Sequence, residues 1–183
     1  MAILRTFAKR SFWFVALLLP LGISAQPRSG LSEQELKAAA LNQMVHFARW
    51  PAEAFSESNS PLVIGIYGED PFGSLMDDLV EGESAFGHPI KIVRCFTPEA
   101  AATCHAVFVR GSDKRSADLL VHVLSGKSVL TICDDENITA AGAVVGLTVR
   151  NNRIHILVNL EAARRAKVTL SSKLLRLAEI VKQ

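Results

Sequence analysis

The feature that most constrains this fold is an alternation of short apolar runs with helix-forming segments. Four runs of four to seven residues have the length and composition of buried strands, namely 62–67, 90–96, 106–109 and 129–133. Helix signals separate each run from the next. Such an alternation predicts a mostly parallel sheet that is covered by helices on both faces.

Capping residues indicate where the helices begin. Ser32 followed by Glu35 forms a capping box, which predicts a helix that starts there and stops near Pro51. Asp70, with a proline directly after it, predicts the start of a second helix. Asp113 is a suitable N-cap for a third.

The C-terminal region follows a different pattern. Apolar residues at 144–149 and 154–158 flank Asn151 and Asn152, and asparagine tolerates the positive φ of a two-residue hairpin turn. Ser171 then caps a last helix, which we expect to run to position 181. We therefore predict an α/β fold, a three-layer α/β/α sandwich whose mostly parallel sheet ends in a C-terminal antiparallel hairpin.

The first residues of the chain have the layout of a secretory signal peptide. Basic residues lie within the first ten positions, residues 12–21 are apolar, and small residues end at Ala25. The apolar run is shorter than the about 20 residues that a membrane span needs. We predict a signal peptide at 1–25 and one domain at 26–183 that works outside the cytoplasm.

The predicted cleavage changes the charge balance. The whole chain has 20 Lys and Arg and 18 Asp and Glu, a formal net charge of +2. Three of the basic residues and none of the acidic ones lie in the predicted signal peptide, which leaves 17 and 18 and a net charge of −1. We therefore expect no nucleic-acid partner, because a strongly basic surface is missing.

The chain lacks the residue patterns that identify an enzyme. Gly126, Lys127 and Ser128 resemble the end of a P-loop, but they close a helix and precede a strand, which is the reverse order. No histidines pair at metal-ligand spacing, and the acidic clusters at 77–78 and 134–136 suit solvated turns. We predict no catalytic residue, no metal site and no cofactor.

Three cysteines in an exported chain leave two interpretations open. Cys95 falls late in one predicted strand and Cys104 just before the next, and the connection between them is short enough for a disulfide. Cys133 then has no partner. Alternatively, all three are free and pack as small apolar side chains.

A small-molecule site is a second possible function. Ligands of open α/β sheets bind outside the carboxyl ends of the strands. In this chain, that edge would carry Glu69, Asp70, Arg110 and Ser112. The alternative to a regulatory protein is therefore a small-molecule receptor.

Several segments together resemble the YfiR-like family of exported bacterial proteins. The resemblance extends from Leu36 to Val181 and lies in the order and spacing of the segments, not in any one motif. The segments are FARWP at 47–51, LVIGIYG at 62–68, DPFG at 70–73, CH at 104–105, VLTI at 129–132, VNL at 158–160, ARRA at 163–166 and LSSKLL at 170–175.

The resemblance implies a periplasmic α/β/α protein that is often dimeric and belongs to a family with no established enzymatic activity, so we expect no enzyme. The characterised type represses a membrane diguanylate cyclase, which makes cyclic-di-GMP, by binding the periplasmic sensor domain. An OmpA-like outer-membrane lipoprotein relieves that repression. We expect a regulatory protein that docks on the sensor domain of a diguanylate cyclase or a sensor kinase. The candidate contact residues are Asn151, Asn152, Arg153, Arg164 and Arg165.

One departure from the family concerns the cysteines. The resemblance implies a disulfide between the first strand and the cysteine that precedes the third strand, which is Cys104 here. This chain has Gly65 in the corresponding region of its first strand. Either Cys95 takes over as the partner of Cys104, or the redox control is absent.

Overall fold

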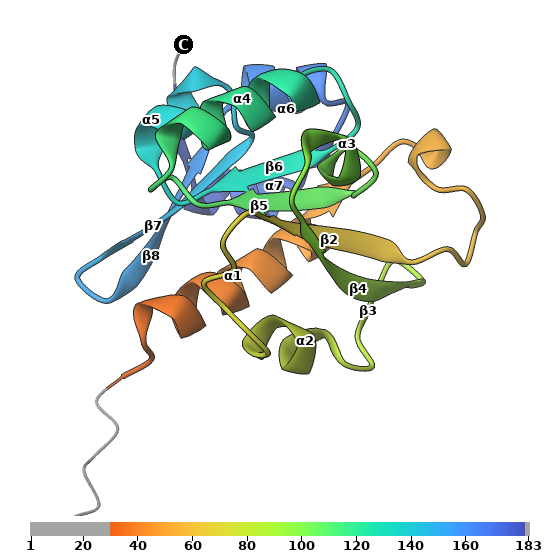
Figure 1. Cartoon of the computed structure of the whole chain (residues 1–183), viewed down its shortest axis with the longest axis horizontal. Coiled ribbons are helices and arrows are strands. Elements are labelled where there is room, and N and C mark those ends of the chain that lie inside the picture. Colours follow the sequence, from red (N-terminus) through yellow and green to blue (C-terminus); the bar gives the residue numbers. More distant parts are fainter. Residues whose placement is uncertain (1–29, 182–183) are drawn as a thin grey trace, which may run out of the picture.

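An eight-stranded sheet organises residues 30–181, the part of the chain that the computed structural model describes (Figure 1). The strand order is β10-β8-β7-β6-β5-β2-β4-β3. The pairs β3–β4 and β7–β8 are antiparallel and all the others are parallel. The predicted signal peptide at 1–25 lies outside the described residues.

Six strands form the body of this sheet and shorter strands complete its edges. The body consists of β2 (Leu62–Tyr67), β4 (His88–Cys95), β5 (Ala106–Val109), β6 (Leu130–Cys133), β7 (Val145–Arg150) and β8 (Arg153–Val158). The edges are β3 (Ser84–Ala85) and β10 (Glu179–Ile180). A separate pair joins β1 (Ala48–Arg49) to β9 (Thr169–Leu170).

Helices cover both faces of the sheet, which confirms the predicted α/β sandwich. One face packs against α1 (Glu33–Phe47), α2 (Leu75–Val80), α6 (Leu160–Arg165) and α7 (Ser172–Leu177). The other packs against α3 (Pro98–Ala101), α4 (Lys114–Leu124) and α5 (Glu136–Ala141). A short 3-10 helix, η1 (Ala52–Ala54), follows β1.

Alternating side chains divide the strands between two cores. In β2, Ile64 and Ile66 belong to the core beneath α1 and α2, whereas Val63 and Tyr67 pack against the opposite core. This division follows from the two-residue period of a strand. It also explains why the strands read as continuous apolar runs, since both faces are buried.

Several sequence-based expectations for the elements were wrong in detail. Asp70 does not begin α2, which starts at Leu75, because its carboxylate instead accepts hydrogen bonds from Phe72 and Gly73 in a preceding turn. The acidic segment at 134–136 leads into a helix, α5, for which Asp135 is the N-cap. The last helix ends at Leu177, and the residues after it pair with β8 as β10.

Other local expectations are confirmed. The capping box of α1 is formed in both directions, since the Ser32 Oγ accepts from the Glu35 amide and the Ser32 amide donates to the Glu35 carboxylate. Asn151 and Asn152 have φ angles of 51° and 58°. Positive φ at both central residues is the requirement of a type I′ turn, and it aligns the β7–β8 hairpin.

Candidate functional site

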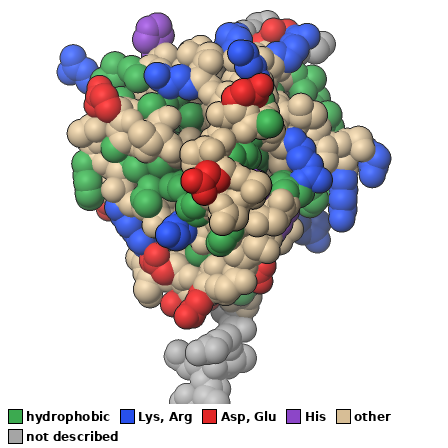
Figure 2. All heavy atoms as spheres, turned by 90° about the vertical axis from the view of Figure 1, so that its right-hand side faces the viewer, with side chains coloured by type: hydrophobic (Ala, Val, Ile, Leu, Met, Phe, Trp, Pro, Cys, Tyr) green, Lys and Arg blue, Asp and Glu red, His purple; other side chains and the backbone are tan. Residues whose placement is uncertain are grey.

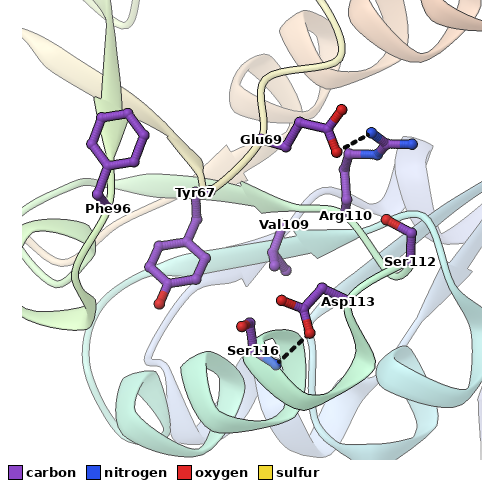
Figure 3. A pocket seen from close by; sticks show the side chains of 9 residues that line it. Tyr67, Glu69, Phe96, Val109, Arg110, Ser112, Asp113 and Ser116 are labelled. Atoms are coloured by element: carbon purple, nitrogen blue, oxygen red, sulfur yellow. Dashed lines mark hydrogen bonds and ion pairs between the residues drawn. The ribbon is translucent and has the colours of Figure 1, made fainter.

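The order of the strands predisposes one edge of the sheet to bind a ligand. The chain passes from β2 to β4 on one side and then crosses to β5 on the other side of β2. The winding direction therefore reverses at the carboxyl end of β2, and crevices of open α/β sheets form at such a point. A pocket of about 260 Å³ opens there (Figure 3).

The pocket combines aromatic walls with polar groups on its rim. Tyr67 and Phe96 lie on one side, and the Phe96 ring is 75% exposed. The Arg110 guanidinium pairs with the Glu69 carboxylate at 2.8 Å on the opposite side. The remaining lining residues are Gly68, Val109, Ser112, Asp113 and Ser116.

The base of the pocket is the start of α4. The Asp113 carboxylate accepts a hydrogen bond of 3.1 Å from the Ser116 amide. Hydrogen bonding to the Ser116 side chain, and then to this amide, lowers the pKa of Asp113. Because the Asp113 carboxylate caps α4 at this point, its negative charge opposes the binding of an anion at the start of the helix. The arrangement suits a small ligand with an apolar body, held by aromatic contact and by hydroxyl or charged groups.

Three of the four predicted ligand residues meet in this pocket. Glu69, Arg110 and Ser112 line it, whereas Asp70 points into the turn before α2. There the Asp70 carboxylate pairs with Arg94 at 3.0 Å, and Arg94 also binds Asp77 at 2.6 Å. The hydrogen bond from Arg94 lowers the pKa of Asp77. The two ion pairs of Arg94 therefore stabilise the turn before α2.

The structure also brings Cys95 and Cys104 together. Their sulfur atoms are 3.7 Å apart and both side chains are buried. Cys95 ends β4 beside Tyr67 of β2, and the four-residue helix α3 returns the chain to Cys104, just before β5. The thiols are free in this structure, so the disulfide stays a prediction.

Gly65 makes room for the two sulfur atoms. A Cβ atom at this position would lie 2.8 Å from the Cys104 sulfur and 3.3 Å from that of Cys95. Burial, followed by the neighbouring Cys95, raises the pKa of the Cys104 thiol to about 12. The third cysteine, Cys133, is buried in the same core, and burial raises its pKa to about 12.

The predicted contact residues lie in two places. Asn151, Asn152 and Arg153 form the tip of the β7–β8 hairpin, which projects from the molecule (Figure 1). Arg164 and Arg165 lie on α6, which follows the other end of β8. Six residues of strand span about 20 Å, so these groups do not form one continuous surface.

An aromatic stack at the opposite edge of the sheet was not foreseen. The Phe55 ring stacks on His88 at a centroid distance of 3.8 Å and on His105 at 4.4 Å. The His105 Nδ1 accepts from the Val63 amide at 3.0 Å, and its Nε2 lies 3.0 Å from the Ala54 carbonyl. Trp50 donates from its indole nitrogen to the His105 carbonyl. No sequence spacing links residues so far apart in the chain.

A groove between α6 and β9–α7 was also missed. It has a volume of about 300 Å³, and its walls are mainly apolar. In Figure 2, apolar side chains gather on the left half of the face shown, and Lys and Arg side chains crowd its right margin. Among residues 30–181, no group of three or more His, Cys, Asp or Glu side chains is placed to hold a metal ion.

Comparison with known proteins relates the chain to a protein family. A family model described as YfiR/HmsC-like matches residues 34–179. The matched region includes all of the strands β1 to β9 and every helix of the described chain, except for Glu33 at the start of α1. No curated protein matches the chain.

Proposed function

Because the chain belongs to the YfiR/HmsC-like family, we propose that it is a periplasmic regulator that docks on the sensor domain of a membrane diguanylate cyclase or sensor kinase. Members of this family are periplasmic regulators of diguanylate cyclases and not catalysts. The family match over nearly all of the described chain is the observation that carries the proposal.

The mechanism is a shift in the populations of the partner's two states. A regulator changes an equilibrium only by binding one state more tightly than the other. The chain would therefore hold the cyclase in its inactive state by preferring that state of the sensor domain. A hundredfold preference corresponds to about 2.7 kcal/mol, within the range of measured couplings between sites.

Export is part of the same proposal. No helix within residues 30–181 is long and apolar enough to cross a bilayer. We propose that residues 1–25 are a signal peptide and that the exported chain begins at Gln26. The mass of the protein recovered from the periplasm tests this, and an intact N-terminus on that protein would refute it.

Binding to a sensor domain tests the proposed function. The exported protein would be titrated by calorimetry into the purified periplasmic sensor domain of a diguanylate cyclase from the same genome. We expect saturable binding and a fall in cyclic-di-GMP synthesis by membranes that contain the whole cyclase. No binding to any such domain at about 100 µM, which corresponds to about −5.5 kcal/mol, would refute the function.

Two accessory parts of the proposal concern assembly. We propose that the chain forms a homodimer and that an OmpA-like outer-membrane lipoprotein can sequester it. Light scattering measures the molar mass of the exported protein in solution and so tests the homodimer. Competition between the lipoprotein and the sensor domain for binding to the chain tests sequestration. Unhindered formation of a ternary complex would contradict sequestration.

We also propose that Cys95 and Cys104 form a disulfide in the oxidising periplasm. The buried sulfur atoms need to approach by less than 2 Å to reach the S–S bond length of about 2.05 Å. Mass spectrometry of peptides from unreduced periplasmic protein would show the Cys95–Cys104 link and a free Cys133. Three free thiols in that material would refute the bond.

A small-molecule receptor is the second candidate function, and the position of the pocket at the reversal point of the sheet favours it. A screen of small amphiphilic metabolites by thermal shift would reveal a ligand. Arg110→Ala should abolish the shift, and Arg115→Ala, on the exposed start of α4, is the matched control. A ligand shift that survives Arg110→Ala and Phe96→Ala would exclude this pocket.

A further inference from the structure

One edge of the eight-stranded sheet is only partly covered. The short strand β3 pairs with β4 at His88 and Pro89, and the Ile90 amide donates to the Glu83 carbonyl. Beyond Ile90, no strand within residues 30–181 pairs with the outer side of β4. The last five residues of β4, at 91–95, therefore form an open edge, which lies beside α2 (Figure 1).

The hydrogen-bond pattern shows which main-chain groups of the open edge face outward. The Cys95 carbonyl accepts from the Gly68 amide, so the main-chain groups of Cys95 point toward β2. Successive residues of a strand direct these groups to opposite sides, so the amides and carbonyls of Ile92 and Arg94 point outward. Within residues 30–181, no hydrogen bond from outside the β2–β4 ladder reaches them. Such an edge is a template for one more strand.

The open edge and α2 enclose a groove of about 460 Å³ that has unpaired carboxylates. Asp78 of α2 and Glu81, directly after α2, line the groove, and both side chains are exposed. Neither forms an ion pair with another residue of 30–181. Asp77 also lines the groove, but Arg94 already holds its carboxylate. Two carboxylates can therefore receive cationic groups from a partner.

The other face of the open edge differs in character. Lys91 and Val93 alternate with Ile90 and Ile92, which pack toward α2, so their side chains lie on the face of α3. Val93 is 37% exposed. Lys91 borders the groove and has no ion pair within residues 30–181, so the unpaired charges there are two carboxylates against one ammonium group. An added strand would meet the carboxylates with alternate side chains and Val93 with the others.

These features favour a basic strand from another protein over a second copy of this chain. In an antiparallel pairing of two copies through this edge, the two-fold axis is perpendicular to the sheet, and both α2 helices lie on the same face. Asp78 and Glu81 would then face the same carboxylates of the other copy, and like charges across an interface are unfavourable. Lys or Arg side chains would instead be attracted to them.

We propose that the sensor domain adds a strand to the open edge of β4, and that alternate side chains of this strand are Lys or Arg directed at Asp78 and Glu81. Strand addition of this kind takes its affinity from main-chain hydrogen bonds and its specificity from alternate side chains. This inference rests on the proposed function, because the partner is the sensor domain. It moves the contact away from the β7–β8 hairpin, whose tip contains the predicted residues Asn151 and Asn152.

A proline in the open edge tests the main-chain contact. Ile92→Pro removes the outward N–H group, and edge strands tolerate proline where that group faces solvent. We expect the affinity for the sensor domain to fall at least about tenfold. The matched control is Ile154→Pro on β8, a half-buried isoleucine whose amide likewise points away from the paired strand. This control should change the affinity less than about threefold.

Charge reversal tests the side-chain contact. The reversed variant carries Asp78→Lys and Glu81→Lys, and we expect its affinity for the sensor domain to fall at least about tenfold. The matched control carries Asp118→Lys on α4 and Glu179→Lys on β10, two exposed carboxylates away from the groove. It should change the affinity less than about threefold. Circular dichroism and the unfolding midpoint establish that each variant is folded.

Hydrogen exchange of the wild-type protein tests the same edge without any substitution. The outward amides of Ile92 and Arg94 should exchange at least about tenfold more slowly in the complex with the sensor domain, as followed by NMR. The amide of Ile154 should exchange at an unchanged rate. Unchanged exchange at Ile92 and Arg94 in a saturated complex would overturn the inference, even if the proline variant does not fold.

The outcomes separate this inference from the proposed function. Wild-type binding that both Ile92→Pro and the charge-reversed variant retain would overturn strand addition and leave the function intact. An absence of wild-type binding would overturn the function and the docking edge together. Equal loss in the Ile154→Pro control would place the contact at the hairpin. Dissociation of a homodimer by Ile92→Pro, with sensor binding unchanged, would assign the edge to a second copy; either of these last two results overturns the inference.

Discussion

At the scale of single residues, His105 links three separate segments of the chain. Its ring is only 8% exposed and carries one accepting and one donating nitrogen, toward Val63 and Ala54 respectively. A doubly protonated ring would direct an N–H group at the Val63 amide, which is itself a donor. The neutral form is therefore the one that fits this site.

This geometry predicts that acid destabilises the fold. Burial is the main cause that lowers the pKa of His105, and the nearby His88, on the other side of Phe55, acts in the same direction. The unfolded chain then binds more protons than the folded one, so stability falls as the pH drops below about 6.5 and through the lower folded-state pKa. Urea unfolding between pH 7.5 and 5 measures this fall.

His105→Gln should weaken that pH dependence, while His122→Gln, an exposed position on α4, should leave it unchanged. The glutamine variant will be less stable at neutral pH because its amide does not reproduce the ring stack. The diagnostic quantity is the slope against pH, not the absolute stability. Equal slopes in all three proteins would contradict the assignment to His105.

Gly65 is the second residue whose identity has a direct structural reason. Gly65→Ala would place a methyl group 2.8 Å from the Cys104 sulfur, so we expect a loss of about 1–3 kcal/mol from overpacking. Cys104→Ala removes that sulfur and should lower the cost of Gly65→Ala. A double-mutant cycle by urea unfolding measures the coupling, and strict additivity would show that the two positions do not interact.

At the scale of elements, the sequence was most informative where a signal is local. The capping box, the four buried runs and the Asn151–Asn152 turn all depend on neighbouring residues, and each is confirmed. The two-residue strands β1 and β9 depend on an antiparallel contact between positions about 120 apart in the chain, which no local pattern encodes. Six-residue α5 was missed because it is too short to display a helical period.

The candidate sites also differ in how far the sequence alone predicts them. The carboxyl edge of the sheet was predictable from the alternation of elements, and three of its four proposed residues meet there. Asp70 was misplaced because the position of Arg94, from a neighbouring strand, decides where its carboxylate points. The groove between α6 and β9–α7 depends on how three short elements pack, which the apolar pattern alone does not determine.

The capping box gives an element-scale prediction. Ser32→Ala removes the acceptor for the Glu35 amide at the start of α1, and loss of such a cap costs about 1 kcal/mol. Ser172→Ala, an exposed serine directly after the cap of α7, is the matched control and should change stability by less than about 0.5 kcal/mol. Equal effects of the two substitutions would show that the α1 cap contributes no specific stability.

The turn of the β7–β8 hairpin gives a second prediction at the scale of elements. Asn152→Val places a β-branched residue at a φ of 58°, and left-handed backbone costs such residues at least about 1–2 kcal/mol. Asn152→Gly relieves that cost and should be close to neutral. Urea unfolding of the two variants compares them, and a tolerated valine would contradict the type I′ turn.

At the scale of the whole molecule, the three cysteine side chains are all buried in the hydrophobic core beneath α3, α4 and α5. Burial raises the pKa of Cys104 and Cys133 to about 12, and the thiolate is the reactive form. After reduction, we expect the folded protein to react with iodoacetamide at pH 8 at least about a hundredfold more slowly than the urea-unfolded chain. Rapid labelling of folded protein would contradict this burial.

The aromatic stack has a consequence for how the molecule can be observed. The chain has two tryptophans, Trp13 in the proposed signal peptide and Trp50 beside His105. The exported form would therefore contain a single indole, 6.2 Å from an imidazole ring and at 88° to it. Fluorescence from that indole is a natural optical probe, which would follow the segment between α1 and β2 as it loosens, without any added label.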